Sequence, residues 1–173
     1  MKNIKIHFFI ILFFVGGLNM SLKAQGNVTS QVFAEIIEAL TASETSQLNF
    51  GKFFPTDAGG EVEVTPEGTR LAYGTITLMG SDHSQAGYQV AGEDAVIYSI
   101  ILPDGPTTLI TSNNSGTMTV DKWETIPPAG EGSGLITGGV QQVALGATLH
   151  VGSIDNNPVG IYSGEYSITF SYN

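Results

Sequence analysis

The sequence predicts an all-β protein built as a sandwich. Short apolar runs rich in β-branched and aromatic residues alternate with turn-forming residues about every eight to twelve positions. In the last stretch, Tyr166–Tyr172, large apolar side chains alternate strictly with small hydroxyl side chains, which is the period of a half-buried strand. Such a strand must pair inside a sheet, because an unpaired apolar edge invites aggregation. Together these observations favour one β-sandwich domain.

The first residues have the pattern of a secretory signal peptide. Lys2 and Lys5 form a basic start, Phe8–Val15 is an uninterrupted apolar run, and a small residue, Ala24, follows. The apolar run is shorter than the roughly 20 residues that a spanning helix needs. We therefore expect residues 1–24 to be removed and the protein to be exported to the periplasm, the cell surface or the medium, with no membrane insertion after cleavage.

The expected mature chain is acidic and has no cysteine. Removal of 24 residues from 173 leaves 149, enough for one domain with a real core. The expected mature chain has three basic and 16 acidic residues, so its net charge is −13. Such a surface repels nucleic acid and anionic lipid, so neither is an expected partner. Without cysteine, stability must come from the sheets, and the composition suggests a bacterial envelope protein.

The segment Val28–Leu40 fits more than one structure. A helical stripe and a strand face can both be drawn through it, with Val28, Val32 and Ile36 on the strand face. The all-β character of the rest favours a strand over Val32–Ser43. We expect residues 25–33 to form an N-terminal arm and residues 34–173 to form a single domain. A strand of this domain, a strand donated to another domain and a helix remain open alternatives.

The remaining apolar runs predict the other strands. In chain order they are Leu48–Phe54, Glu61–Thr65, Arg70–Leu78, Gly87–Val90, Val96–Leu102, Thr107–Thr111, Thr117–Trp123, Gln141–Leu145, Ala147–Val151 and Gly160–Tyr172. Gly, Pro, Asn and Asp predict the turns between them, among them Asp57–Gly60. The one long polar, Gly-rich stretch, Pro127–Gly134, is expected to be a loop.

The alternation within these runs predicts the core. The expected core residues are Phe50, Phe53, Val62, Val64, Ile76, Leu78, Tyr88, Val90, Tyr98, Ile100, Leu102, Met118, Val120, Leu145, Leu149, Val151, Tyr166, Ile168 and Phe170. Trp123, next to the long loop, is expected to cover the edge of this core.

Several motifs in this order resemble one known family. They are Leu48–Phe53 (LNFGKF), the Gly59-Gly60 turn with Val62–Gly68 (VEVTPEG), Gly87–Gly92 (GYQVAG), Tyr98–Pro103 (YSIILP), Gly116–Val120 (GTMTV), Leu145–Gly152 (LGATLHVG) and Gly160–Gly164 (GIYSG). Over about Ala34 to Asn173 the chain resembles the bacterial family catalogued as domain of unknown function 4402. That family is similar to spore coat protein U and to chaperone–usher pilins.

The resemblance implies an Ig-like Greek-key sandwich of pilin or adhesin type. Some sandwiches of that type are incomplete and take a strand from a neighbour. Tyr172 is the penultimate residue and Gly160 is the fourteenth from the end, as in the pilin strand that a chaperone grips. The pilin disulfide is absent, which is a departure from that pattern. The alternative is that Tyr172 is simply the last inward residue of an ordinary strand.

The resulting functional hypothesis is an exported, non-catalytic structural or adhesion protein that assembles by strand addition. Its partners would be copies of itself or other surface subunits, and a periplasmic chaperone. The residues expected to pair are Val28, Val32, Ile36, Gly160, Tyr166, Ile168, Phe170 and Tyr172. The alternative is a monomeric secreted module that binds glycan or another ligand through its loops, with Trp123, Tyr73 and Tyr162 as stacking platforms.

Catalysis, metals and cofactors are not expected. Ser81–Ser84 (SDHS) has the letters of a hydrolase triad, but a triad needs groups that converge from separate elements. The expected mature chain has only two histidines, His83 and His150, and no cysteine, so a zinc site is not expected. His150 stands between Leu149 and Val151, which predicts an outward position on a strand.

Overall fold

The computed structural model describes residues 27–173, and every regular element within them is a β-strand. The strands are β1 (Thr41–Ser46), β2 (Lys52–Val64), β3 (Arg70–Met79), β4 (Ala86–Ala91), β5 (Ile97–Ile101), β6 (Thr107–Thr111), β7 (Thr117–Ile126), β8 (Gly130–Leu135), β9 (Val140–Val151), β10 (Tyr162–Ser163) and β11 (Thr169–Tyr172). Across these described residues, no helix is long and apolar enough to cross a membrane. The predicted all-β sandwich is confirmed.

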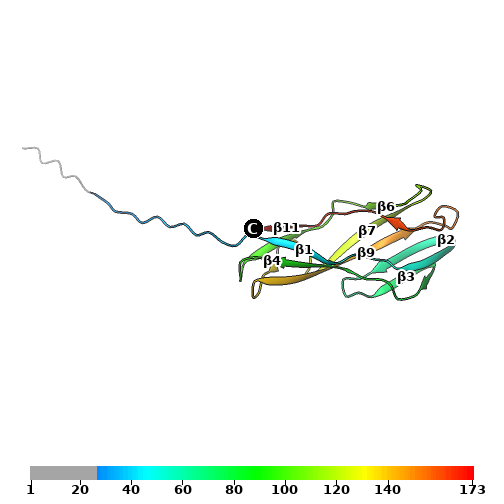
Figure 1. Ribbon diagram of the computed structural model, residues 1–173, viewed down its shortest axis with the longest axis horizontal. Helices are drawn as coiled ribbons and strands as arrows, with labels where there is room; N and C mark the ends of the chain where they lie inside the picture. The colour runs from blue at the N-terminus through cyan, green and yellow to red at the C-terminus, as the bar shows by residue number, and fades with distance from the viewer. Residues whose placement is uncertain (1–26) are drawn as a thin grey trace, which may run out of the picture. The chain divides into compact units, whose positions relative to one another are not determined.

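The larger sheet is organised around β9. Its strand order is β1-β4-β9-β7-β6-β10, and β2 joins it by pairing with β9 and with β3 (Figure 1). The first half of β9 pairs with β4 and the second half pairs with β2, so these two strands share one edge of β9. The sequence predicts two strands here, and this is wrong, since β9 continues through Gly146. A Cβ on Gly146 would collide with the backbone of residues 64–66.

The second sheet has three strands in the order β11-β5-β8. β8, Gly130–Leu135, overlaps the stretch Pro127–Gly134 that the sequence predicts to be a loop, so that prediction is wrong from Gly130 to Gly134. Its glycines have a packing role: Gly134 pairs with Tyr98 of β5, and a Cβ on Gly134 would collide with the tyrosine ring. A Gly-rich sequence is therefore compatible with a strand here, because the tyrosine on the neighbouring strand covers the bare backbone.

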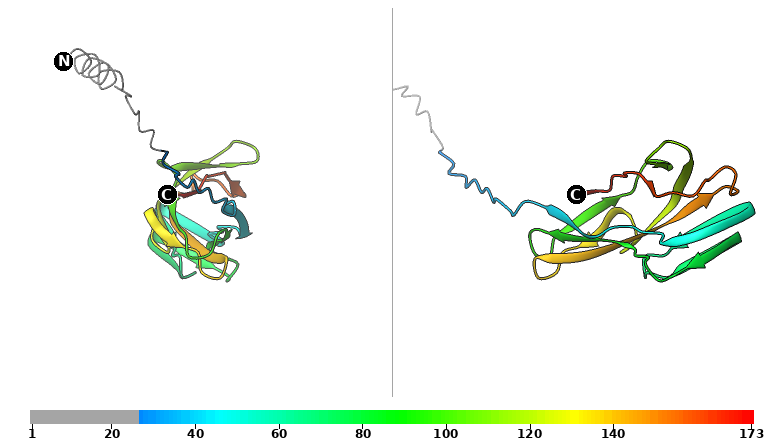
Figure 2. Two further views of the ribbon diagram at one scale, coloured as in Figure 1. Left: turned by 90° about the vertical axis from the view of Figure 1, so that its left-hand side faces the viewer. Right: turned by 45° about the vertical axis from the view of Figure 1, so that its right-hand side comes forward.

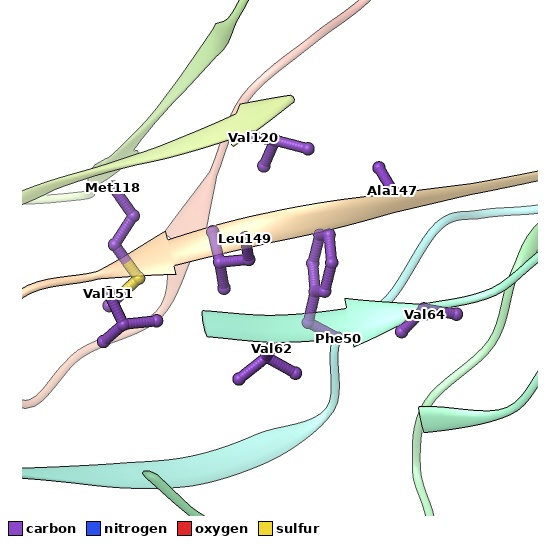
Figure 3. Close-up of a cluster of buried hydrophobic side chains, with 8 residues drawn as sticks. All are labelled: Phe50, Val62, Val64, Met118, Val120, Ala147, Leu149 and Val151. Carbon is purple, nitrogen blue, oxygen red and sulfur yellow. The ribbon is translucent and has the colours of Figure 1, made fainter. Parts of the chain in front are cut away.

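The buried side chains form two clusters. The first contains Phe50, Val62, Val64, Met118, Val120, Ala147, Leu149 and Val151, from β2, β7, β9 and the segment before β2 (Figure 3). The second contains Ala86, Tyr88, Val90, Tyr98, Ile100, Ile136, Val143 and Leu145. Twelve of the expected core residues are buried; Phe53, Ile76, Leu78, Leu102, Tyr166, Ile168 and Phe170 are partly buried against the clusters. The clusters also contain four buried residues that the sequence did not predict to be in the core: Ala86, Ile136, Val143 and Ala147.

Two bulges change which way side chains point. In β2 the register shifts between Pro55 and Gly60, so the turn predicted at residues 57–60 is instead an irregular stretch inside one strand. In β7 the register shifts between Asp121 and Glu124, and Lys122 has a φ of 50°. The extra residue inverts the alternation, so Trp123 packs against both clusters. The expected place of Trp123 at the core edge is confirmed.

The N-terminal strand is shorter than predicted. Residues 27–40 form neither helix nor strand, and the first strand begins at Thr41, so a strand over residues 32–40 is wrong. Residues 36–173 form one compact unit, and residues 27–35 belong to a separate unit. The predicted signal peptide, residues 1–24, lies outside the described residues.

The C-terminal stretch is two short strands rather than one. β10 pairs with β6 of the larger sheet, β11 pairs with β5 of the smaller sheet, and residues 164–168 between them are not strand. The predicted alternation is nevertheless confirmed at Tyr166, Ile168, Phe170 and Tyr172, which all pack against the second cluster. The final segment therefore crosses from one sheet to the other.

Candidate functional site: a groove beside the first cluster

The principal cavity in residues 27–173 is a groove of about 1080 Å³ over the first cluster. Residues 47–55 line one side of it and residues 158–168 line the other. Side chains from β6, β7 and β9 form its floor: Leu109, Met118, Val120, Trp123 and Leu149. The groove exists because the three-stranded sheet covers the second cluster and leaves the first cluster with a thinner cover.

One side of the groove is a strand with a free edge. The start of β2, from Lys52 to Pro55, pairs with Ile76–Met79 of β3. Its other edge has no strand partner among residues 27–173. The Arg70 guanidinium donates to the carbonyls of Phe50 and Lys52. Backbone groups on such an edge that have no partner in the protein are satisfied by water or by an added strand. This side of the groove can therefore accept a strand.

The opposite side also has a free edge. β10 and β11 each pair along one edge only, and residues 164–168 between them make no strand pairing. Tyr166 and Ile168 of this stretch line the groove. Within residues 27–173, two backbone edges without strand partners thus flank an apolar floor, as in a sandwich that lacks one strand. The views of Figure 2 show the C-terminal segment (orange to red) as it passes from β10 to β11.

Aromatic contacts fix the place where the two clusters meet. The Trp123 and Tyr166 rings lie 4.8 Å apart between centroids, and the Trp123 indole N–H donates to the Gly105 carbonyl at 3.3 Å. The Tyr88 and Tyr166 hydroxyls are 2.6 Å apart. Burial raises the pKa of both tyrosines above the ordinary value, so both stay protonated at neutral pH. This contact holds the C-terminal side of the groove in place.

The described arm, residues 27–37, carries apolar side chains that are almost fully exposed. Val28, Val32 and Ile36 are 90%, 93% and 98% exposed, and Phe33 is 86% exposed. Scattered single apolar residues are normal on a protein surface, but here four of them lie close together within nine residues of one segment. The arm therefore has the composition of a strand whose partner is missing.

The residues predicted to pair divide into three groups. Gly160, Tyr166 and Ile168 line the groove. Phe170 and Tyr172 pack against the second cluster and do not line the groove. Val28, Val32 and Ile36 are exposed on the segment that precedes β1.

Sequence reasoning missed the side of the groove formed by residues 47–55. The apolar run at residues 48–54 was visible in the sequence, but nothing local showed that one edge of that strand lacks a partner.

Two of the three aromatic residues considered for sugar stacking are engaged elsewhere. Trp123 packs on Tyr166, and Tyr162 packs on the first cluster while its hydroxyl donates to the Pro158 carbonyl at 2.8 Å. Tyr73 is 49% exposed beside a polar cup of about 260 Å³ that contains Glu61 and Lys122. A hydrogen bond to Glu63 at 2.8 Å raises the pKa of Tyr73.

The two histidines considered for a metal site, His83 and His150, lie in different parts of the fold. The ring Nε2 of His83 lies 3.2 Å from the Gly68 carbonyl. His150 lies on the outward face of β9, as predicted, between Asp121 at 2.6 Å and Glu61 at 3.3 Å. Among residues 27–173 no group of three or more His, Asp or Glu side chains is arranged to hold a metal ion.

Comparison with known proteins gives one family. Neither the curated proteins nor the solved structures contain a match to this chain. The family described as "Domain of unknown function (DUF4402)" matches residues 40–172, from the residue before β1 to the last residue of β11. Because this match spans both sheets and both sides of the groove, the chain belongs to the DUF4402 family.

Proposed function

We propose that this protein is an exported, non-catalytic structural or adhesion subunit that assembles by β-strand addition. The arm of one copy, residues 27–37, enters the groove of another copy and pairs with its two free edges. The observation that carries the proposal is the coexistence in one chain of an apolar groove with two unpaired backbone edges and an exposed apolar arm.

The lengths of the groove and the arm agree. Residues 47–55 line one side of the groove, and only residues 52–55 of them are strand, so this side is at most about 30 Å long at roughly 3.3 Å per residue. The arm, at eleven described residues, is slightly longer than this side. An extended arm therefore reaches along the whole groove.

Apolar burial and backbone hydrogen bonds both favour the filled groove. Each valine or isoleucine moved from water into the groove stabilises the complex by about 1.5–3 kcal/mol. Main-chain hydrogen bonds along the two free edges fix the register, while alternate side chains enter the groove. On the strand face of the arm those side chains are Val28, Val32 and Ile36, with Ser30 and Ala34 between them.

Another copy is the favoured donor, because the sequence offers no turn-forming residues for a tight reversal of the arm into its own groove. To enter its own groove the arm must turn back just before β1. Residues 31–48 contain no Gly, Pro, Asn or Asp, the residues that form two-residue hairpin turns. Copy-to-copy exchange needs no turn and builds a head-to-tail assembly.

Export and a chaperone complete the proposal. The first 24 residues have the pattern of a secretory signal, and a net charge of −13 after their removal suits a secreted protein. A groove with unpaired edges is an aggregation hazard before assembly. A periplasmic chaperone that lends a strand to the groove would protect it until an arm arrives, as the likeness to pilins suggests.

The test compares two proteins by size-exclusion chromatography with light scattering. One begins at Gln25 and the other begins at Glu38, which removes the arm but keeps Leu40 packed against the second cluster. The longer protein is expected to form oligomers that resist heat and SDS. The shorter one is expected to be a monomer that binds an added peptide of residues 27–37.

The contrary result is a stable monomer from the longer protein. It would show that the sandwich is complete without an added strand, and strand exchange would be abandoned. Ligand binding by a monomeric module would then be the better hypothesis, with the cup beside Tyr73 as the first place to test glycans, since the other two candidate rings are packed.

A further inference from the structure

The hydroxyl of Tyr172 joins two segments that are far apart in the chain. It accepts a hydrogen bond from the backbone N–H of Glu93 at 2.9 Å and donates one to the backbone carbonyl of Glu38 at 2.9 Å. The phenol hydroxyl thus acts both as a hydrogen-bond donor and as an acceptor. The fit is close, because a Cβ on Gly92 would collide with this hydroxyl.

Both backbone hydrogen-bonding groups of Glu38, its N–H and its C=O, have partners in the folded unit. Its N–H donates to the Glu93 carboxylate at 3.2 Å, while its carbonyl accepts from Tyr172. Two residues further on, Leu40 packs against the second cluster. The root of the arm, residues 38–40, is therefore fixed to the folded unit, and the exposed arm begins just before it.

The position of this contact matters for the groove. The lining of the groove ends at Ile168 on one side and begins at Glu44 on the other. Tyr172 lies four residues after Ile168, in β11, and Glu38 lies six residues before Glu44, so their contact joins the two chain segments just beyond the groove. The tyrosine side chain thus ties the two sides together at the end where the chain's own arm begins. A returning arm would have to pass between residues that this contact joins.

We propose that the Tyr172–Glu38 contact closes the root end of the groove to the chain's own arm, so that each groove stays available for the arm of another copy. The inference rests on the proposed function and identifies the residue that decides between self-insertion and exchange. An arm from another copy does not begin at the tied end. It can enter through the length of the groove away from the Tyr172–Glu38 contact.

The test is Tyr172→Phe in the full chain, which keeps the ring and removes both hydrogen bonds. The ratio of heat- and SDS-resistant monomer to resistant oligomer is measured on unboiled gels over a dilution series. We expect this ratio to rise about ten-fold, because two hydrogen bonds are lost and each net hydrogen bond shifts an equilibrium by roughly two- to ten-fold. Gly92→Ala, which displaces the hydroxyl while retaining the tyrosine, is expected to act in the same direction.

A matched control separates self-insertion from mere instability. Tyr172→Phe in a chain that begins at Glu38 must give no resistant monomer, because that chain has no arm to insert. A variant that only destabilises the fold would lower every resistant species rather than raise one of them.

The outcomes distinguish the two proposals. If the unaltered chain forms arm-dependent oligomers and both variants leave the ratio unchanged, the role of Tyr172 is overturned and strand exchange stands. If the unaltered chain stays monomeric with or without its arm, strand exchange is overturned, and the role of Tyr172 is overturned with it.

Discussion

At the scale of single residues, Tyr98 shows how this cysteine-free core obtains its order. Its side chain is fully buried in the second cluster, and its hydroxyl donates to the Gln141 side-chain carbonyl at 2.8 Å. The ring lies over Gly134 of the neighbouring strand, where no other residue would leave room. One tyrosine thus links β5, β8 and β9.

Burial of Tyr98 predicts a loss of stability at high pH. Burial raises its pKa from 10 to about 12, so the folded state retains the proton more strongly than the unfolded state. This contribution to stability is complete below pH 10 and falls as the pH rises from 10 towards 12, by about 1.4 kcal/mol per pH unit. Denaturant titrations from pH 8 to pH 11.5 measure it.

Tyr98→Phe is the control for that experiment. The variant should be less stable at pH 8, because the Gln141 side-chain oxygen loses one of its two donors and keeps only the Leu135 N–H, but its stability should fall less steeply above pH 10. Parallel pH profiles for the two proteins would show that Tyr98 is not responsible for the slope.

At the scale of elements, the arm is the segment whose structure and sequence disagree. It has the apolar content of a strand, and in residues 27–40 it forms no regular element. A strand forms only where its backbone groups find partners, and these residues make no strand pairing within the described chain. The same side chains are expected to become ordered in the groove of another copy.

The alternation of the arm predicts which face enters the groove. Val32→Asp should weaken oligomer formation about 100-fold, because a carboxylate would be buried in an apolar groove without a partner. Gln31→Asp, one position away on the opposite face, should have little effect. Sedimentation or light scattering over a concentration series compares the two. Equal effects would contradict an extended arm in this register.

At the scale of the whole molecule, the groove leaves one part of the first cluster without a covering strand from the described residues. The first cluster is covered by the start of β2 and the C-terminal segment, and the groove between them reaches Met118, Val120 and Leu149. A ligand that binds only the folded state stabilises it by mass action. Filling the groove should therefore stabilise the entire domain rather than one edge of it.

This effect can be measured with a free peptide. A peptide of residues 27–37, at about 100 times its dissociation constant, should stabilise the chain that begins at Glu38 by about 2.7 kcal/mol. For a domain of this size that corresponds to a rise in Tm of about 10 °C by calorimetry. The same peptide with Val32→Asp is the control. An unchanged Tm with the unaltered peptide would show that the groove is not its binding site.

The sequence by itself determined the local features of this protein. A period of two in the apolar residues depends only on neighbouring side chains, so it identified the all-β class, strands such as β6, and inward residues such as Val62 and Leu149. The order of motifs identified the family. The sequence also showed that Val28–Leu40 is rich in apolar residues, although it did not decide between a strand of this domain, a donated strand and a helix.

Only the tertiary structure decided which edges are paired and which are free. Pairing depends on contacts between residues far apart in the chain, so no local pattern shows that β9 is continuous or that β8 is a strand. The bulge at Lys122 turns Trp123 inward, against the alternation that precedes it. The groove arises for the same reason: each of its sides is predicted as an ordinary strand from the sequence, and the groove exists because no third strand from residues 27–173 lies between them.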